Sequence, residues 1–254
     1  MKRIIITLTM LALFVVTLSA QCTMKNTAIK DGEKISYNLY YNWQFVWVKA
    51  GTASLTTTET TYKGQRAFRS SLRTQTNERL DKVFCMRDTL VGYTTLDLAP
   101  LYYRKGAREG NYYTVDEVSY SYPNGVCHAK MHRQKNNGKH VYETKTFENC
   151  LFDMVNMFQR ARSFDATGWK KGHTQRFLIA DGVKALPGKL TFNGRKNVKA
   201  DNGKQYECLE LSYIETENGK DKEIARFFVT DDDQHIPVRL DMNLKFGTAK
   251  AYLK

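Results

Sequence analysis

Residues 236–246 read Ile-Pro-Val-Arg-Leu-Asp-Met-Asn-Leu-Lys-Phe, with a large apolar side chain at every second position. Successive side chains of a β-strand point to opposite faces of its sheet, so a period of two is typical of a strand that buries one face. The same alternation runs through Ile35–Tyr41, Val46–Ala50 and Leu209–Tyr213. The chain is therefore predicted to be mainly β.

Turn residues separate these alternating runs. Asp-Gly or Asn-Gly pairs recur along the chain at Asp31-Gly32, Asn137-Gly138, Asn193-Gly194 and Asn218-Gly219. Both residues of such a pair tolerate the positive φ of a tight hairpin turn. Hairpins in series predict an antiparallel meander, which must curl or close to protect its edges. We expect a meander curled into an open or closed barrel-like sheet.

One segment has a different period. Between Cys150 and Phe164 the apolar residues recur every three or four positions, which predicts a helix at about residues 150–164. Asn149 is placed to cap its start, and Arg160 and Arg162 stand in its last turns, where cations suit the helix dipole. We expect this helix to pack against the sheet, between two halves of one β-rich domain (residues 21–254). Two separate domains are the alternative.

The first 20 residues have the pattern of a secretory signal peptide (residues 1–20). Lys2 and Arg3 precede an apolar run, and small residues lead to a predicted cleavage after Ala20. The run is shorter than the roughly 20 residues that a spanning helix needs, and none follows it, so no transmembrane span is expected in the mature chain. We predict export to the periplasm or cell envelope. Lipidation at Cys22 is the alternative, although Gln21 fits its motif poorly.

The composition suits a packed domain with a basic surface. Removing 20 of the 254 residues leaves 234, and 42% of the whole chain is hydrophobic, enough for a core. Loss of Lys2 and Arg3 lowers the net charge from +13 to +11. Outside the cytoplasm, such a surface suits phosphorylated lipid headgroups or anionic glycans better than nucleic acid, so no nucleic-acid partner is expected. The simpler interpretation is a solvated surface that maintains solubility.

Five cysteines follow the predicted cleavage site: Cys22, Cys85, Cys127, Cys150 and Cys208. An odd number in an oxidising compartment permits at most two disulfides, and the sequence leaves their pairing open. The sequence contains no C-x-x-C motif, and the wide spacing suits small buried residues on strands. A catalytic thiol is not expected.

The motifs of common enzymes are absent from the sequence, including G-x-S-x-G, H-E-x-x-H and the Walker loop. His128 and His132 are four residues apart, but along a strand that is about 13 Å, too far for one metal ion. Residues 231–233 are three adjacent Asp residues without the spacing of a calcium loop, and we interpret them as a charged turn before a strand that Pro237 opens. We therefore predict no metal, no cofactor and no catalytic residue.

Two apolar clusters provide the candidate ligand-binding residues. One cluster lies at the first hairpin and the other on the predicted helix: Trp43 and Trp47, then Phe152, Met154, Met157 and Phe158. Aromatic rings can stack on sugars or line an apolar pocket, and flexible methionines suit apolar ligands. Packing in a filled core is the alternative for both clusters.

Several segments together resemble a known family. They are Gly32-Glu33 before Ile35, then Val48-Lys49-Ala50-Gly51-Thr52-Ala53, then Asp231-Asp232 before Ile236-Pro237-Val238, and the closing stretch Phe246–Leu253. From about Asp31 to Leu253 the chain resembles an exported bacterial family, domain of unknown function 3108. Around Asp153 it resembles the helix of that family, although Met157-Phe158-Gln159-Arg160 departs from the family pattern. The resemblance implies export and a β-rich fold, and it supplies no catalytic residues.

These observations favour a non-enzymatic protein of the cell envelope. We expect it to hold an apolar or amphipathic, lipid-like ligand between the sheet and the helix. The alternative is an envelope scaffold or protein-interaction module with a filled core and an exposed aromatic patch around Trp43 and Trp47. A glycan hydrolase is the third hypothesis, and it requires two carboxylates about 5–10 Å apart in a cleft.

Overall fold

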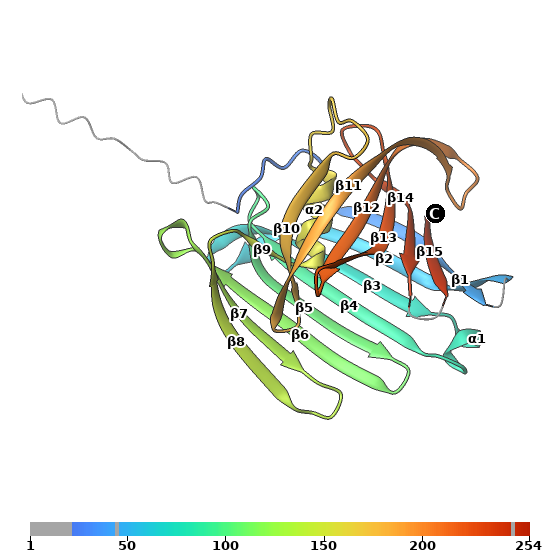
Figure 1. The fold of residues 1–254 in the computed structure, drawn as a ribbon. Helices are drawn as coiled ribbons and strands as arrows, with labels where there is room; N and C mark the ends of the chain where they lie inside the picture. The colour runs from blue at the N-terminus through green and yellow to red at the C-terminus, as the bar shows by residue number, and fades with distance from the viewer. Residues whose placement is uncertain (1–21, 44–45, 245–246) are drawn as a thin grey trace, which may run out of the picture.

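A computed structural model describes residues 22–43, 46–244 and 247–254, with the side chain of Trp43 excepted. The predicted signal peptide and its cleavage site lie outside the described residues. Fifteen strands form one sheet in the order β8-β7-β6-β5-β4-β3-β2-β1-β15-β14-β13-β12-β11-β10-β9 (Figure 1). The prediction of a mainly β, barrel-like sheet is confirmed.

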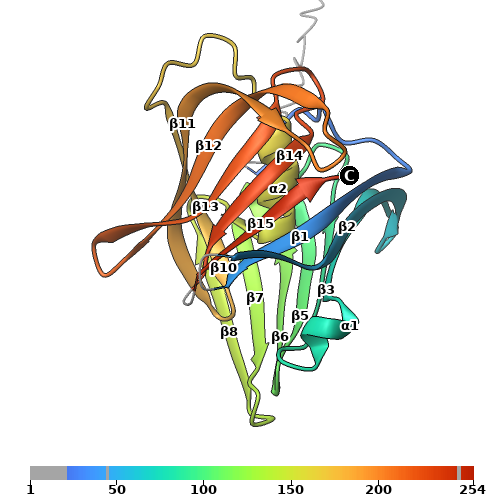
Figure 2. The same cartoon turned by 90° about the vertical axis from the view of Figure 1, so that its right-hand side faces the viewer.

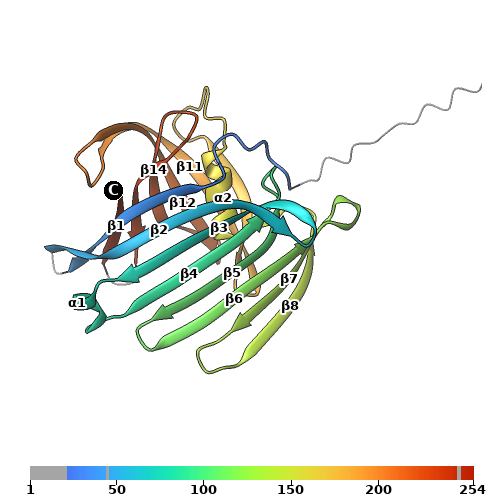
Figure 3. The ribbon, with the colours of Figure 1, turned by 180° about the vertical axis from the view of Figure 1, so that it is seen from behind.

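The first half of the chain is a meander in which each strand pairs with the next (Figure 3). Its strands are β1 (Glu33–Trp43), β2 (Val46–Tyr62), β3 (Gln65–Thr76), β4 (Met86–Thr94), β5 (Pro100–Glu109), β6 (Tyr112–Ser121), β7 (Cys127–Gln134) and β8 (His140–Phe147). A short helix, α1 (Glu78–Asp81), joins β3 to β4, and the 3-10 turn η1 (Pro123–Gly125) joins β6 to β7.

The second half returns to the first and nearly closes the sheet. Its elements are β9 (Leu151–Phe152), α2 (Met154–Arg162), β10 (Thr174–Asp181), β11 (Lys184–Lys199), β12 (Gln205–Glu217), β13 (Lys220–Thr230), β14 (Pro237–Asn243) and β15 (Thr248–Leu253). β15 pairs with β1, where Tyr41 stands opposite Ala249. The described strands pair antiparallel except for β9 with β10, which is parallel. The two ends of the sheet are β8 and β9, so the barrel stays open between them.

The period of two along the strands builds the apolar interior. Ile35 on β1 stands opposite Leu55 on β2, Leu55 opposite Leu72 on β3, and Leu72 opposite Leu90 on β4. Because opposite residues of neighbouring strands point to the same face, these four side chains form one apolar row across the sheet. The row faces the interior, where Ile35, Leu55 and Leu90 are buried.

The long helix starts later than the sequence predicts. α2 begins at Met154, and the side chain of Asp153, not of Asn149, caps it by accepting a hydrogen bond from Asn156 N. Leu151 and Phe152 belong to β9 and pair with β10. Their apolar side chains continue the helical spacing of the sequence by chance, because a two-residue strand has too few positions to show its own period. Arg160 and Arg162 do occupy the last turn.

α2 crosses the inside of the sheet near one end. It passes over a single cross-strand row that consists of Gly92, Ser70, Thr57 and Glu33. Gln159 Nε2 donates to Ser70 Oγ at 2.9 Å, and Arg162 is paired with Glu33. We call this end of the sheet the α2 end. The opposite end, where β3 passes through α1 into β4, is the α1 end (Figure 2).

Candidate functional site

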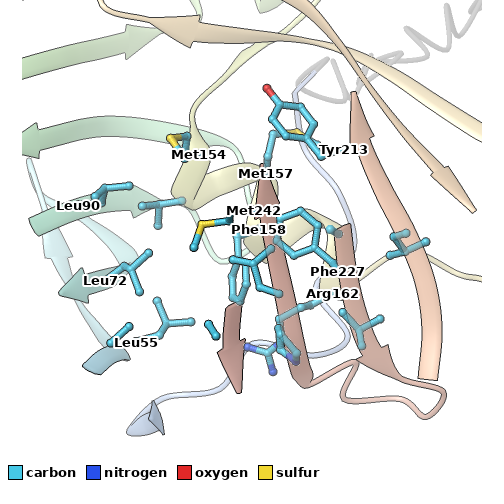
Figure 4. Close-up of a pocket in the computed structure, with 18 of the residues that line it drawn as sticks. Leu55, Leu72, Leu90, Met154, Met157, Phe158, Arg162, Tyr213, Phe227 and Met242 are labelled. Carbon is cyan, nitrogen blue, oxygen red and sulfur yellow. The ribbon is translucent and has the colours of Figure 1, made fainter. Parts of the chain in front are cut away.

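An apolar cavity of about 230 Å³ lies between α2 and the inner face of the sheet (Figure 4). One wall is α2, with Met154, Val155, Met157, Phe158, Ala161 and Arg162. The facing wall from β1 to β4 contributes Tyr37, Leu39, Ala53, Leu55, Leu72, Thr74 and Leu90. Every one of these strand residues lies on the α1 side of the row that α2 crosses. The helix therefore closes the cavity at the α2 end, and the cavity extends toward the α1 end.

The other wall comes from the second half of the chain. Strands β10 to β15 contribute Phe177, Ile179, Leu190, Leu211, Tyr213, Phe227, Val229, Pro237, Leu240, Met242 and Ala251. Met242 and Phe227 lie near Phe158 in Figure 4. Because both halves of the sheet and the helix supply side chains, the cavity exists only when the sheet has curled around α2.

The size of the cavity restricts what it could hold. At about 230 Å³ it exceeds the engineered apolar cavity of about 150 Å³ that binds benzene. It is smaller than the roughly 300–1,000 Å³ of sites for drug-sized ligands. A single acyl chain or another slender apolar group fits this range better than a lipid with two chains. Met154 lines the cavity and is 48% exposed, so the cavity wall reaches solvent there.

The structure brings together half of the candidate ligand-binding residues. Met154, Met157 and Phe158 line the cavity. Phe152 lies outside it, because it precedes α2 on β9 and its ring packs under the guanidinium of Arg160, whose Cζ is 4.4 Å from the ring centroid.

Trp47 of the first hairpin does not line the cavity. Trp47 stands at the start of β2, is 41% exposed, and has Lys250 Nζ 4.3 Å from its ring centroid. Trp43 ends β1, and its side chain lies outside the described residues. The sequence of this hairpin is rich in aromatic residues, but it does not indicate which rings face the interior and which lie at the rim of the sheet.

An ion pair between the buried Arg162 and the partly exposed Glu33 forms the polar boundary of the cavity, and sequence reasoning missed it. Arg162 is 1% exposed, and its Nη1 and Nη2 donate to the two carboxylate oxygens of Glu33 at 2.7 Å each. Arg162 Nη2 also donates to the Gln234 carbonyl at 3.1 Å. The positive charge of Arg162 is therefore balanced by the carboxylate of Glu33, so Arg162 is not available to bind an anionic ligand. From the sequence, Arg162 was expected only to interact favourably with the dipole at the end of the helix, and no partner for it was predicted.

Tyr37 lines the cavity beside this ion pair. Burial raises the pKa of Tyr37 well above its usual value, with Arg162 lowering and Glu33 raising it by smaller amounts. Within the described residues its hydroxyl has no hydrogen-bond partner. The phenol stays neutral at physiological pH, so the interior wall carries no net charge at this point.

The opposite side of α2 is polar and holds the helix on the sheet. Asn156 Nδ2 donates to the Leu98 carbonyl at 2.9 Å, and Gln159 reaches Ser70. Asp153 is buried, and this burial raises the pKa of its carboxyl to about 7, although hydrogen bonds from Asn156 N and the Tyr120 hydroxyl oppose the rise. α2 therefore has one apolar face toward the cavity and polar side chains that bond β3 and the connection between β4 and β5.

A disulfide ties the N-terminal segment to the start of this helical region. Cys22 is bonded to Cys150, 128 residues away, and Arg160 Nη1 donates to the Cys22 carbonyl at 2.9 Å. A chain with this bond has no Cys22 thiol to carry a thioether-linked lipid. Cys85, Cys127 and Cys208 are free thiols. Burial raises the pKa of Cys127, and that of Cys208 to about 12, which keeps both thiols protonated.

His128 and His132 lie on β7, a strand, as predicted. His132 on β7 has Nδ1 2.8 Å from Glu117 Oε2 and Nε2 2.8 Å from His140 Nδ1, while His128 is bonded to Thr146 instead. Across the described ranges no group of three or more His, Cys, Asp or Glu residues is placed to hold a metal ion.

The three aspartates form the predicted turn between two strands, β13 and β14. Asp232 accepts hydrogen bonds from the backbone amides of Gln234 and His235 at 2.9 and 3.1 Å. Pro237 begins β14. The carboxylate of Asp232 therefore holds the turn, which agrees with the interpretation of the sequence as a charged turn.

The model of an uncharacterised protein family, protein of unknown function DUF3108, matches residues 36–254. The chain belongs to the DUF3108 family. A comparison of this DUF3108 chain with curated proteins finds no match. In the part of the chain described, neither helix has the length and apolar character needed to cross a membrane.

A solved structure shares the fold of this DUF3108 chain. It is a β-barrel-like protein of domain of unknown function DUF1849 from Brucella abortus, with a TM-score of 0.55 and 11% sequence identity. The match covers 89% of this chain and 98% of the other. At this identity the likeness concerns the architecture alone.

Proposed function

We propose that this DUF3108 protein binds an apolar or amphipathic ligand, with the apolar part in the cavity between α2 and the sheet. The observation that carries the proposal is the cavity itself, about 230 Å³ with apolar side chains on α2 and on both halves of the sheet. Burying apolar surface there is favourable by about 25 cal/mol for each Å² removed from water. No catalytic step is part of the proposed function.

The chemistry of the walls selects the kind of ligand. The charged side chain that lines the cavity, Arg162, is already paired with Glu33. A buried anionic headgroup would have to displace this carboxylate, which costs more than leaving the headgroup in water. The ligand is therefore expected to insert its apolar part and to leave any charged group outside.

The proposed setting is the cell envelope after export. Its support is the signal-peptide pattern of residues 1–20 and the disulfide between Cys22 and Cys150, since disulfides persist in oxidising compartments. The bond joins a residue just after the predicted cleavage site to the helical region that lines the cavity.

The alternatives have weaker support. A scaffold with a filled core does not require a cavity, and the cavity is present. A glycan hydrolase requires two carboxylates in a cleft, and the side chains that line the cavity within the described residues include none.

The proposal is tested by titrating the mature protein with N-phenyl-1-naphthylamine, whose fluorescence rises in apolar surroundings, and displacing it with a single-chain fatty acid. Saturable binding and displacement are expected. Thr74→Phe places a ring into the cavity wall and is expected to weaken probe binding at least about tenfold.

The matched control is Thr89→Phe. Thr89 precedes the cavity residue Leu90 on β4, so its side chain points to the outer face of the sheet. This variant is expected to bind the probe like the unaltered protein. If no saturable binding occurs, or if both variants weaken it equally, the cavity is not a ligand site.

A further inference from the structure

The exposed large apolar side chains gather at one end of the sheet. Among the described residues they are Val46, Trp47, Val48, Val83, Phe84, Tyr112, Tyr113, Tyr142, Met154 and Leu244. Met154 belongs to the cavity wall. The others stand on or next to the connections β1–β2, β3–β4, β5–β6 and β14–β15, or near the start of β8.

The strand register places all these connections at the α1 end. Trp43 is opposite Val46, Met86 is opposite Glu109, and Asn243 is opposite Thr248. β1 runs from Glu33 at the α2 end to Trp43, and β15 pairs with it so that Tyr41 faces Ala249. The turns therefore share one rim of the sheet (Figure 1). The cavity residues of β1 to β4 lie on the side of α2 that faces this rim.

These apolar side chains are exposed enough to contact a binding partner. Val83 is 75% exposed, Tyr112 is 68% and Val46 is 61%. Isolated exposed apolar residues are ordinary, but a set confined to one rim marks an interaction surface. At the α2 end, the turn between β13 and β14 contains three adjacent Asp residues, 231–233.

The same rim carries positive charge. Exposed lysines on or next to its connections are Lys82, Lys135, Lys139, Lys184 and Lys220. Carboxylates at this end are partly neutralised within the protein, since Asp81 is paired with Arg87, Asp181 with Arg133 and Asp221 with Lys189. Glu78, Glu109 and Glu217 offset part of the lysine charge. Apolar tips with surrounding lysines are the combination by which proteins bind the interface of an anionic bilayer.

We propose that the α1 end docks on an anionic lipid bilayer, with the apolar turn residues in the interface and the lysines against the headgroups. The proposal rests on the proposed function. A bilayer beneath the rim would face the end of the sheet toward which the cavity extends. It would then be the source or acceptor of the ligand in the cavity. A docked carrier exchanges an apolar ligand without carrying it through water.

The test is co-sedimentation of the mature protein with vesicles of phosphatidylglycerol and phosphatidylcholine, with vesicles of phosphatidylcholine alone as the comparison. Binding is expected to the anionic vesicles and to weaken as salt is raised, because salt screens exposed charges. The double variant Lys82→Glu and Lys139→Glu is expected to bind at least about tenfold more weakly. Val46→Ser with Val83→Ser removes apolar side chains and is also expected to weaken binding.

The matched control reverses two exposed lysines at the α2 end, Lys170→Glu and Lys171→Glu, which changes the net charge by the same amount. Its binding is expected to stay within about twofold of the unaltered protein. Equal weakening by both double variants would overturn the docking surface, because net charge alone would then explain the binding.

The docking surface and the cavity can fail separately. Thr74→Phe is expected to lose the naphthylamine probe and to keep vesicle binding. If the unaltered protein binds the probe but no vesicle, the bilayer is overturned as the occupant and a protein partner takes its place. If it binds vesicles but not the probe, the proposed function fails while the rim still docks.

Discussion

Arg162 and Glu33 lie 129 residues apart in the sequence and form a two-pronged ion pair inside the protein, with both nitrogen-to-oxygen distances at 2.7 Å. Arg162 ends α2 and Glu33 begins β1, so the pair fixes the last turn of the helix to the edge of the cavity. The pair also joins the connection between β13 and β14 through the carbonyl of Gln234.

The first prediction concerns this pair. Glu33→Gln leaves a guanidinium that is 1% exposed without its carboxylate, and we expect a loss of about 3 kcal/mol in the free energy of unfolding. The double variant Glu33→Leu with Arg162→Met contains no buried charge and should lose less than Glu33→Gln alone. Urea denaturation measures both variants against the unaltered protein. A double variant that loses as much stability as Glu33→Gln, or more, would show that the unpaired guanidinium is not the cause of the loss.

The second prediction concerns the disulfide between Cys22 and Cys150. The bond closes a long loop, 128 residues in sequence, so Cys22→Ser with Cys150→Ser should lower the free energy of unfolding by about 2–4 kcal/mol. Dithiothreitol should lower the stability of the unaltered protein by a similar amount and leave the double variant unchanged. Cys85→Ser is the control, because Cys85 is a free thiol and should have no such effect.

The third prediction is a pH dependence from Asp153. Its pKa in the folded protein, about 7, is above the ordinary value of 3.8, so the folded state holds the proton more tightly than the unfolded state. Stability from this group is present below about pH 4 and is lost as the pH rises through 7. Asp153→Asn keeps the helix cap and should gain about 1–3 kcal/mol at pH 8, with little change near pH 4.

Urea denaturation at both pH values, with Asp165→Asn as control, measures this effect. Asp165 lies on the loop after α2, and hydrogen bonds from Thr167 lower the pKa of its carboxyl, the opposite direction. A loss of stability in Asp153→Asn at pH 8 would show that the charged carboxylate is favourable where it is.

The fourth prediction concerns the contact between β4 and α2. A Cβ on Gly92 would lie 2.8 Å from Val155 Cγ1, so Gly92→Ala forces the helix away from the sheet. We expect a loss of about 1–3 kcal/mol from this overpacking. Adding Val155→Ala removes the 2.8 Å contact with Cγ1, although Cβ remains 3.0 Å away, and should restore part of the stability, measured by thermal unfolding. If Val155→Ala makes the loss larger, the contact is not the cause.

The candidate site was only partly predictable from the sequence. Met154 and Phe158 lie on the apolar stripe of a helix, and the helical spacing found them because neighbouring turns of a helix share a face. Phe152 was placed on the same helix, but the chain forms a strand there, and a two-residue strand leaves no period to detect. Trp47 looked equally suited to a binding site, and its position at the rim of the curled sheet keeps it out of the cavity.

The sequence by itself determined the strands, their hairpins and the helix, because alternation, turn residues and helical spacing are local properties of neighbouring positions. Only the tertiary structure decided that β15 pairs with β1, that Cys22 joins Cys150 and that Arg162 meets Glu33. It also decided that α2 lies inside the curl and leaves a cavity beside it. These features depend on the twist and curl that accumulate over all the strands of the sheet. A short stretch of sequence does not determine this total.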